Sequence, residues 1–276
     1  KQLWRATAPE QLHAQFHRLH RENRTADMAS LRQSSPVANY ITPAAAHLHI
    51  ARRACPILPK IHLYQAELAG AVANPESDAR ALERVRTTAG VDPRLLLACG
   101  QLELQAGRAT EACLTWRRCI ESDETQLDRV METADAQLDL GEYIQDLLPD
   151  SPPLLLRAAR EYFSSPEREE VRRRIAARVE ALITEFQLRP EEQRFLLGGV
   201  YELRGEFSEA ISAYQKALII QPSEAAWHYQ LAILLRTQGR HNEAREHAKA
   251  CRRLRPDNQL YENLLKEIIH AQLTGG

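Results

Sequence analysis

Apolar and small side chains recur at a fixed interval in the last third of the chain. A shift of 34 residues places small residues or prolines on residues of the same type in three pairs: Gly205 and Gly239, Ala210 and Ala244, and Pro222 and Pro256. Between these positions, apolar residues four apart, such as Leu197 and Tyr201, fall on one face of a helix. A period of about 34 residues with small residues at fixed places predicts an array of helix–turn–helix units.

Each recurring residue has a structural role in such a unit. Gly198 and Ala210 would let two antiparallel helices approach closely, because a larger side chain would hold the backbones apart. Gly205 would follow the first helix, where a residue with positive φ ends a helix at low cost. Pro222 would separate one unit from the next, because proline is tolerated in a first turn and not inside a helix. One hairpin cannot bury its own apolar face, so we expect the units to stack.

The stretch FLLGGVYELRGEFSEAISAYQKALIIQPSE resembles the tetratricopeptide repeat, and the following stretch WHYQLAILLRTQGRHNEAREHAKACRRLRPDN resembles it too. Weaker copies lie earlier in the chain and match the pattern at small and aromatic positions, namely Gly100, Gly107, Ala112, Trp116 and Cys119. We expect Trp116 to lie in the core. The resemblance implies an all-α fold, a right-handed superhelical solenoid of stacked antiparallel helix pairs.

We expect one continuous solenoid with five parts of different regularity. These are a degenerate helical part at 1–58, weak repeat-like units at 59–150, an irregular helix pair at 151–190, two good repeats at 191–258, and a capping helix with a tail at 259–276. A division of the chain near 150–153 is an alternative, because the sequence PDSPP is stiff.

The composition excludes several classes of function. Apolar residues make up 44% of the 276 residues, which is typical of a globular chain, and the net charge is −1. A general polyanion binder needs an excess of Lys and Arg, so we expect no nucleic-acid partner. No apolar run approaches the ~20 residues that span a bilayer, so we expect no membrane insertion by this segment. The five cysteines form no CxxC pair, which gives no support to a zinc or redox motif.

The strongest candidate for metal or catalytic chemistry is the sequence HAQFHRLH. Its histidines His13, His17 and His20 are spaced at i, i+4 and i+7 and share one helical face. A metal-dependent enzyme using them is one alternative, but no HExxH pattern or evident fourth ligand accompanies them, so a solvated amphipathic helix is favoured. Phosphate-binding loops and nucleophile elbows are also missing from the sequence. We therefore expect no cofactor, no metal and no catalytic residue.

The resemblance implies that the first helix of each pair lines a concave groove that binds a protein or peptide. The corresponding positions in this chain are Arg94, Leu97, Gln101, Gln105, Glu192, Phe195, Gly199, Glu202, Tyr229, Gln230, Ile233 and Arg236. Chaperone-binding members of the family hold a C-terminal carboxylate with a Lys/Asn clamp. Phe195, Gly199, Tyr229 and Ile233 stand at those positions here, so we expect no binding of chaperone C-terminal tails.

The sequence thus predicts a non-catalytic scaffold that binds another protein. A fainter resemblance supports a second reading: HLHIARRACPILPKIHLYQAELA is similar to the repeats that follow the membrane part of bacterial O-antigen ligase or polymerase-like proteins. That resemblance implies a soluble C-terminal domain of a multi-span enzyme of surface-polysaccharide assembly. The chain begins at Lys1 and not at Met, so we expect it to continue a longer protein. The compartment, cytoplasmic or periplasmic in a bacterial cell, stays open.

Overall fold

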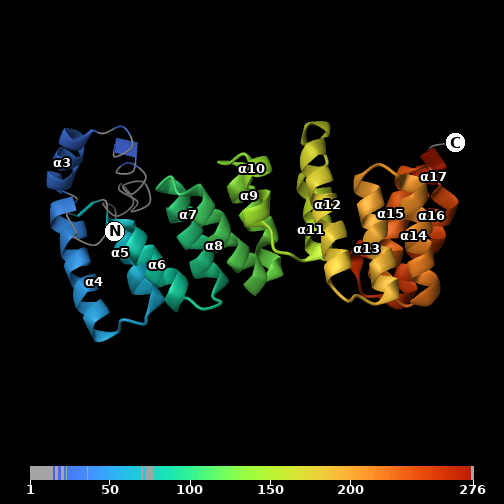
Figure 1. Cartoon of the computed structure of the whole chain (residues 1–276), viewed down its shortest axis with the longest axis horizontal. Coiled ribbons are helices and arrows are strands. Elements are labelled where there is room, and N and C mark those ends of the chain that lie inside the picture. The colour runs from blue at the N-terminus through green and yellow to red at the C-terminus, as the bar shows by residue number, and fades with distance from the viewer. Residues whose placement is uncertain are drawn as a thin grey trace. The chain divides into compact units, whose positions relative to one another are not determined.

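The structure, a computed structural model, describes residues 24–35, 37–69, 71–72 and 78–274, together with 15, 18, 19 and 22. Every regular element in these residues is a helix, and consecutive helices pack as antiparallel pairs (Figure 1). The predicted fold class, an all-α array of stacked helix pairs, is therefore confirmed. The chain divides into two compact units, residues 1–149 (unit 1) and residues 150–276 (unit 2).

Unit 1 contains short, variable helices. In chain order they are α3 (Thr25–Gln33), a π-helical turn (Val37–Ile41), α4 (Thr42–Ala54), α5 (Pro59–Ala69), α6 (Asp78–Thr88), α7 (Pro93–Gln105), α8 (Ala109–Ser122), a 3-10 turn (Glu124–Gln126), α9 (Leu127–Asp135) and α10 (Leu140–Leu147). Aspartates begin two of the helices. The Asp92 carboxylate accepts from the Arg94 amide at 3.0 Å, and Asp139 accepts from the Gly141 amide at 2.9 Å.

The pair α7–α8 packs around Trp116, which is fully buried as predicted. Its ring lies against Gly100, where a Cβ atom would overlap the indole, and its Nε1 donates to the Leu97 carbonyl at 3.2 Å. Beside it, the buried Glu103 carboxylate accepts from Thr115 Oγ1 at 2.6 Å. The small residue in the first helix therefore makes room for the aromatic residue in the second.

Unit 2 contains longer and more regular helices. They are α11 (Pro152–Tyr162), a 3-10 turn (Pro166–Arg168), α12 (Glu169–Glu185), α13 (Pro190–Leu203), α14 (Phe207–Ile220), α15 (Ala225–Thr237), α16 (His241–Leu254) and α17 (Gln259–Thr274). The pairs α11–α12, α13–α14 and α15–α16 follow one another, and α17 packs against α15 and α16 (Figure 1). The first helices α11, α13 and α15, together with α17, position the site described below.

The turns inside the two regular pairs use glycine as the sequence predicts. Gly205 and Gly239 have φ values of 79° and 72°. After α13, the Glu206 amide donates to the Tyr201 carbonyl at 2.9 Å, which closes the last turn of the helix. The spacing of 34 residues therefore places a glycine with left-handed backbone conformation at the same point of each pair.

Candidate functional site: an aromatic groove in unit 2

A cleft of about 700 Å³ opens along α11 and the N-terminal halves of α13, α15 and α17. Each of these helices contributes apolar side chains to its lining, namely Leu156, Phe195, Leu196, Trp227, Tyr229, Leu260 and Tyr261. These helices are the first members of their pairs and the final helix. The cleft, called the central cleft below, therefore follows from the alternation of inner and outer helices in the array.

Aromatic rings connect neighbouring first helices across the cleft. Phe195 of α13 stacks on Trp227 of α15 with ring centroids 4.9 Å apart and an interplanar angle of 12°. Tyr229 of α15 lies 5.3 Å from Tyr261 of α17 in a tilted arrangement. Rings at these separations stabilise each other and present a rigid apolar surface.

The close approach of α11 and α13 depends on Gly199. A Cβ atom there would lie 2.5 Å from Leu156 Cδ1 and 3.1 Å from Arg160 Nη2. The backbone of α13 therefore forms part of the wall against which the α11 side chains pack. Any larger residue at position 199 would have to displace them.

The ring of Phe195 lies 5.1 Å from that of Tyr214, which belongs to a closed triangle of three polar side chains. Arg160 Nη2 donates to Glu202 Oε2 and to Tyr214 Oη, both at 2.9 Å, and Tyr214 Oη donates to Glu202 Oε2 at 2.8 Å. Burial opposes the charge of Arg160, yet Tyr214 and Glu202 together hold its pKa above the ordinary value. Burial also raises the pKa of Tyr214, so its hydroxyl stays protonated and donates. The triangle ties α11, α13 and α14 together.

The other arginines at the central cleft also form ion pairs. Arg157 donates to Glu161 at 3.0 Å along α11. Arg189 pairs with Glu192 at the start of α13 and lies 3.5 Å from Glu191. The arginines that line the central cleft are thus paired with carboxylates, and the cleft itself presents an aromatic surface.

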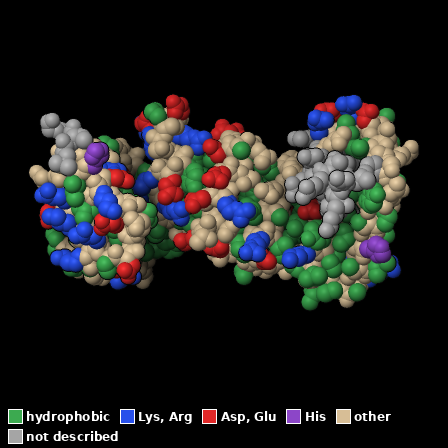
Figure 2. All heavy atoms as spheres, turned by 180° about the vertical axis from the view of Figure 1, so that it is seen from behind, with side chains coloured by type: hydrophobic (Ala, Val, Ile, Leu, Met, Phe, Trp, Pro, Cys, Tyr) green, Lys and Arg blue, Asp and Glu red, His purple; other side chains and the backbone are tan. Residues whose placement is uncertain are grey.

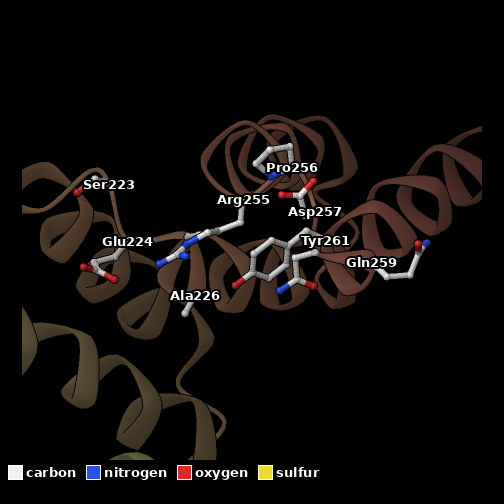
Figure 3. A pocket seen from close by; sticks show the side chains of 10 residues that line it. Ser223, Glu224, Ala226, Arg255, Pro256, Asp257, Gln259 and Tyr261 are labelled. Atoms are coloured by element: carbon white, nitrogen blue, oxygen red, sulfur yellow. The ribbon is translucent and has the colours of Figure 1, made fainter.

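Two further depressions adjoin the central cleft. One, of about 410 Å³, reaches the C-terminal ends of α11 and α13 and shares four residues with the central cleft, Arg160, Glu161, Tyr229 and Gln230. The other, of about 710 Å³, lies at the N-terminal ends of α15 and α17 and also shares four, Glu224, Ala226, Asn258 and Tyr261. Figure 3 shows the second depression, in which the Arg255 guanidinium points toward the Glu224 carboxylate beside the Tyr261 ring. Because neighbouring depressions share residues, they form one extended groove in unit 2.

The groove positions expected from the sequence fall in several places. Glu192, Phe195, Tyr229 and Gln230 line the central cleft, and Glu202 and Ile233 line the adjoining depression. Arg236 instead pairs with Glu267 of α17. In unit 1, Arg94 and Gln101 are exposed, Gln105 is half-buried, and Leu97 is only 6% exposed and so offers no accessible surface.

Sequence reasoning missed Trp227, Tyr261, Leu156 and Arg160 as lining residues. A signal for Trp227 was present, since it lies one helical turn before Gln230 and so shares its face. Tyr261 was overlooked because its helix was interpreted only as a cap.

Over the residues that the structure describes, no group of three or more His, Cys, Asp or Glu side chains could hold a metal ion. The histidines His13, His17 and His20 lie outside the described residues. No described helix is both long and apolar enough to cross a bilayer.

Comparisons with known proteins show which residues are similar to a known repeat family. Two family models described as tetratricopeptide repeat match residues 172–225 and 203–268. Residues 172–268 are therefore similar to tetratricopeptide repeats. No curated protein matches the sequence.

Solved structures with a similar arrangement are distant in sequence. A chain of the Cut9–Hcn1 hetero-tetramer of the APC/C is 17% identical with a TM-score of 0.38, over 87% of this chain and 48% of that one. This chain thus spans about half the length of that relative. The C-terminal part of a repeat-containing protein from Cytophaga hutchinsonii is 11% identical with a TM-score of 0.34, over 87% and 98%. MamA from Desulfovibrio magneticus is 16% identical with a TM-score of 0.30, over 73% and 97%.

Proposed function

We propose that the chain is a non-catalytic scaffold and that the groove of unit 2 binds a segment of a partner protein. One observation carries the proposal: α11, α13, α15 and α17 together surround an apolar cleft with two pairs of aromatic rings. Clefts of this kind, apolar with a few polar groups at the rim, are the usual sites of recognition. Aromatic side chains are also the residues that most often dominate binding energy at protein interfaces.

The charges favour an apolar or uncharged segment over a strongly acidic or basic one. Arg157, Arg160 and Arg189 already pair with carboxylates of the same unit. A charged ligand would have to compete with these pairs and would itself lose water in the cleft. An uncharged segment would bury apolar surface against Trp227 and Tyr229 without this competition.

A free C-terminal carboxylate is not expected to anchor the ligand. Phe195 and Gly199 occupy two of the positions where a Lys/Asn clamp would stand, and the phenyl ring of Phe195 is stacked on Trp227. Amidation of a bound peptide's C-terminus should therefore leave its affinity unchanged within about twofold.

A photo-crosslinking amino acid at Gln230, which lines the central cleft, would identify the ligand in cells. The same amino acid at Lys249, on the outer helix α16, is the matched control. The proposal expects crosslinks from position 230 to one class of segment that position 249 does not reach. The same products from both positions would contradict a groove-specific ligand.

Binding of the captured segment should then be measured with a synthetic peptide and the purified chain. Tyr229→Ala should weaken binding by about tenfold or more, because the ring lines two of the depressions. Tyr143→Ala removes a half-buried tyrosine from α10 in unit 1 and should have no effect on affinity. Equal affinity of wild type and Tyr229→Ala would exclude the groove as the binding site.

A further inference from the structure

The loop between α4 and α5, residues 55–58, exposes large apolar side chains. Ile57 is 76% exposed and Leu58 is 45% exposed, and they lie in sequence between two other exposed apolar residues, Ile50 of α4 (66%) and Tyr64 of α5 (48%). Figure 2 shows apolar side chains gathered over this end of unit 1. We call Ile50, Ile57, Leu58 and Tyr64 the α4–α5 tip. Isolated exposed apolar residues are ordinary, but a group of this kind indicates a contact surface.

The loop is held in place by hydrogen bonds and does not fold back on the core. His62 Nε2 donates to the Pro56 carbonyl at 2.7 Å, and the His62 side chain is buried. At the two ends of the loop, the Cys55 amide donates to Ala51 and the Ile61 amide donates to Leu58. A short turn fixed in this way presents Ile57 and Leu58 outward.

Basic residues border the α4–α5 tip, and acidic residues are missing from its sequence neighbourhood. Between Asp27 and Glu67 the chain carries no Asp or Glu, although its net charge is −1. Arg53 and Lys60 stand on either side of the loop and are exposed. The nearest carboxylate in sequence, Glu67, follows Lys60 by seven residues, or two helical turns along α5. The local charge therefore favours an anionic partner.

We propose that the α4–α5 tip binds the surface of an anionic lipid bilayer. Ile57 and Leu58 enter the boundary between headgroups and acyl chains, while Arg53 and Lys60 place their charged ends at the lipid phosphates. The Tyr64 ring, apolar with a polar hydroxyl, suits the headgroup level. The contact is peripheral, because it is made by a loop and the two helices beside it at their exposed residues.

The arrangement fits a bilayer better than a second protein. The apolar core of a protein interface is depleted in Lys and needs a partner of complementary shape. A lipid surface adapts to a projecting tip and requires only apolar residues at the end and cations around them. Two exposed cations and two exposed aliphatic side chains meet that requirement within eight residues, Arg53 to Lys60.

Flotation of the full chain with vesicles tests the proposal. Vesicles of equal parts phosphatidylcholine and phosphatidylglycerol should bind the chain, and phosphatidylcholine alone should bind it more weakly. The variant I57S/L58S should lose tenfold or more in affinity, about what the loss of two buried aliphatic side chains predicts. The variant R53Q/K60Q should lose about fivefold for each cation, and only on the anionic vesicles.

Ile219→Ser is the matched control, because Ile219 is 80% exposed on α14 of unit 2 and lies outside the α4–α5 tip. It should bind vesicles as the wild type does. Circular dichroism should show the same helix content for all variants, since every altered side chain is exposed.

Failure of the wild type to bind either vesicle, or equal binding by I57S/L58S, would overturn the proposal. Sedimentation velocity supplies the other decisive outcome: if I57S/L58S abolishes self-association of the wild type, the tip joins two copies of the chain.

Discussion

The ring of Tyr214 in α14 packs directly against the backbone of Gly198 in α13. A Cβ atom on Gly198 would lie 2.6 Å from Cδ1 and Cε1 of the Tyr214 ring, and that ring is fully buried. Gly100 and Trp116 stand in the same relationship in α7–α8, also 16 residues apart. At the equivalent positions of α15–α16 both residues are small and fully buried, Ala232 and Ala248.

Gly198→Ala should destabilise unit 2 by about 1–2 kcal/mol. The overlap with the ring costs about 1–3 kcal/mol, and the better helix propensity of alanine returns up to about 1 kcal/mol. The ring cannot move aside easily, because its hydroxyl is bound to Arg160 and Glu202. Hydrogen exchange of peptides from α13 and α14 would measure the opening free energy.

A double-mutant cycle isolates the Gly198–Tyr214 contact. In a Tyr214→Ala background, which imitates the Ala232 and Ala248 pair, Gly198→Ala should be neutral or stabilising by up to about 1 kcal/mol. If Gly198→Ala costs the same in both backgrounds, the ring is not the reason for the glycine.

Gly205 serves a different purpose and should respond differently. No atom lies within 4 Å of a Cβ built on it, but its φ is 79°. Gly205→Ala should therefore cost about 1–2 kcal/mol through backbone strain alone. Gly205→Asn should cost less, because asparagine tolerates the left-handed region. Thermal melting of the two variants checks the order, and equal losses would contradict a purely conformational role.

The sequence predicts the regular part of the fold because small residues are needed at contacts that recur. Gly205 and Gly239 are visible at a spacing of 34 since each ends a helix in the same way. The periodicity could not place Leu97, because it belongs to an apolar run in which Leu95, Leu96 and Leu97 are all buried. Where a helix is buried on most sides, its pattern does not say which side chain reaches a groove.

The candidate site depends more on contacts between distant residues than on the repeat. Arg160 meets Glu202 across 42 positions, a separation that is not a multiple of the period. Tyr261 completes an aromatic pair with Tyr229 from α17, which lies outside the three helix pairs of unit 2. Such partners differ from one helix pair to the next. A repeat pattern therefore identifies the helices that line a groove but not the side chains that give the groove its chemistry.

The triangle of Arg160, Glu202 and Tyr214 should matter more for stability than the neighbouring surface pair. Arg160→Met leaves a carboxylate that is only 18% exposed without its cation, at a cost of about 2 kcal/mol once partial solvent access is considered. Tyr214→Phe removes one hydroxyl and should cost about 1 kcal/mol. Urea denaturation measures both changes.

Arg157→Met is the matched control on the same helix. Arg157 and Glu161 are 43% and 46% exposed, and a pair this accessible contributes about 0.2–1 kcal/mol. A loss in Arg157→Met as large as that in Arg160→Met would show that the triangle has no special role.

Unit 2 should lose stability in mild acid through His228 and His247. Their Nδ1 atoms are 2.9 Å apart, and His228 Nε2 lies 3.1 Å from the Pro222 carbonyl. His228 Nε2 therefore donates to Pro222. When both rings are neutral, the lone pair of His228 Nδ1 accepts from His247 Nδ1. Burial, followed by repulsion from the charged form of His228, lowers the pKa of His247 to about 4. Burial also lowers the pKa of His228.

A lowered histidine pKa means that the folded state resists protonation more than the unfolded chain does. The stability from neutral His247 is therefore present above its unfolded pKa of about 6.5 and is lost as the pH falls from there toward 4. At pH 5 the loss should be about 1 kcal/mol, because partial solvent access weakens the effect of burial. Hydrogen exchange in α15 and α16 from pH 7.5 to pH 5, corrected for the intrinsic rate, should show it, and His247→Gln should flatten the profile. An NMR titration of His247 with a midpoint near 6.5 would rule the explanation out, because the nearby Glu243 and Glu246 would then have compensated for burial.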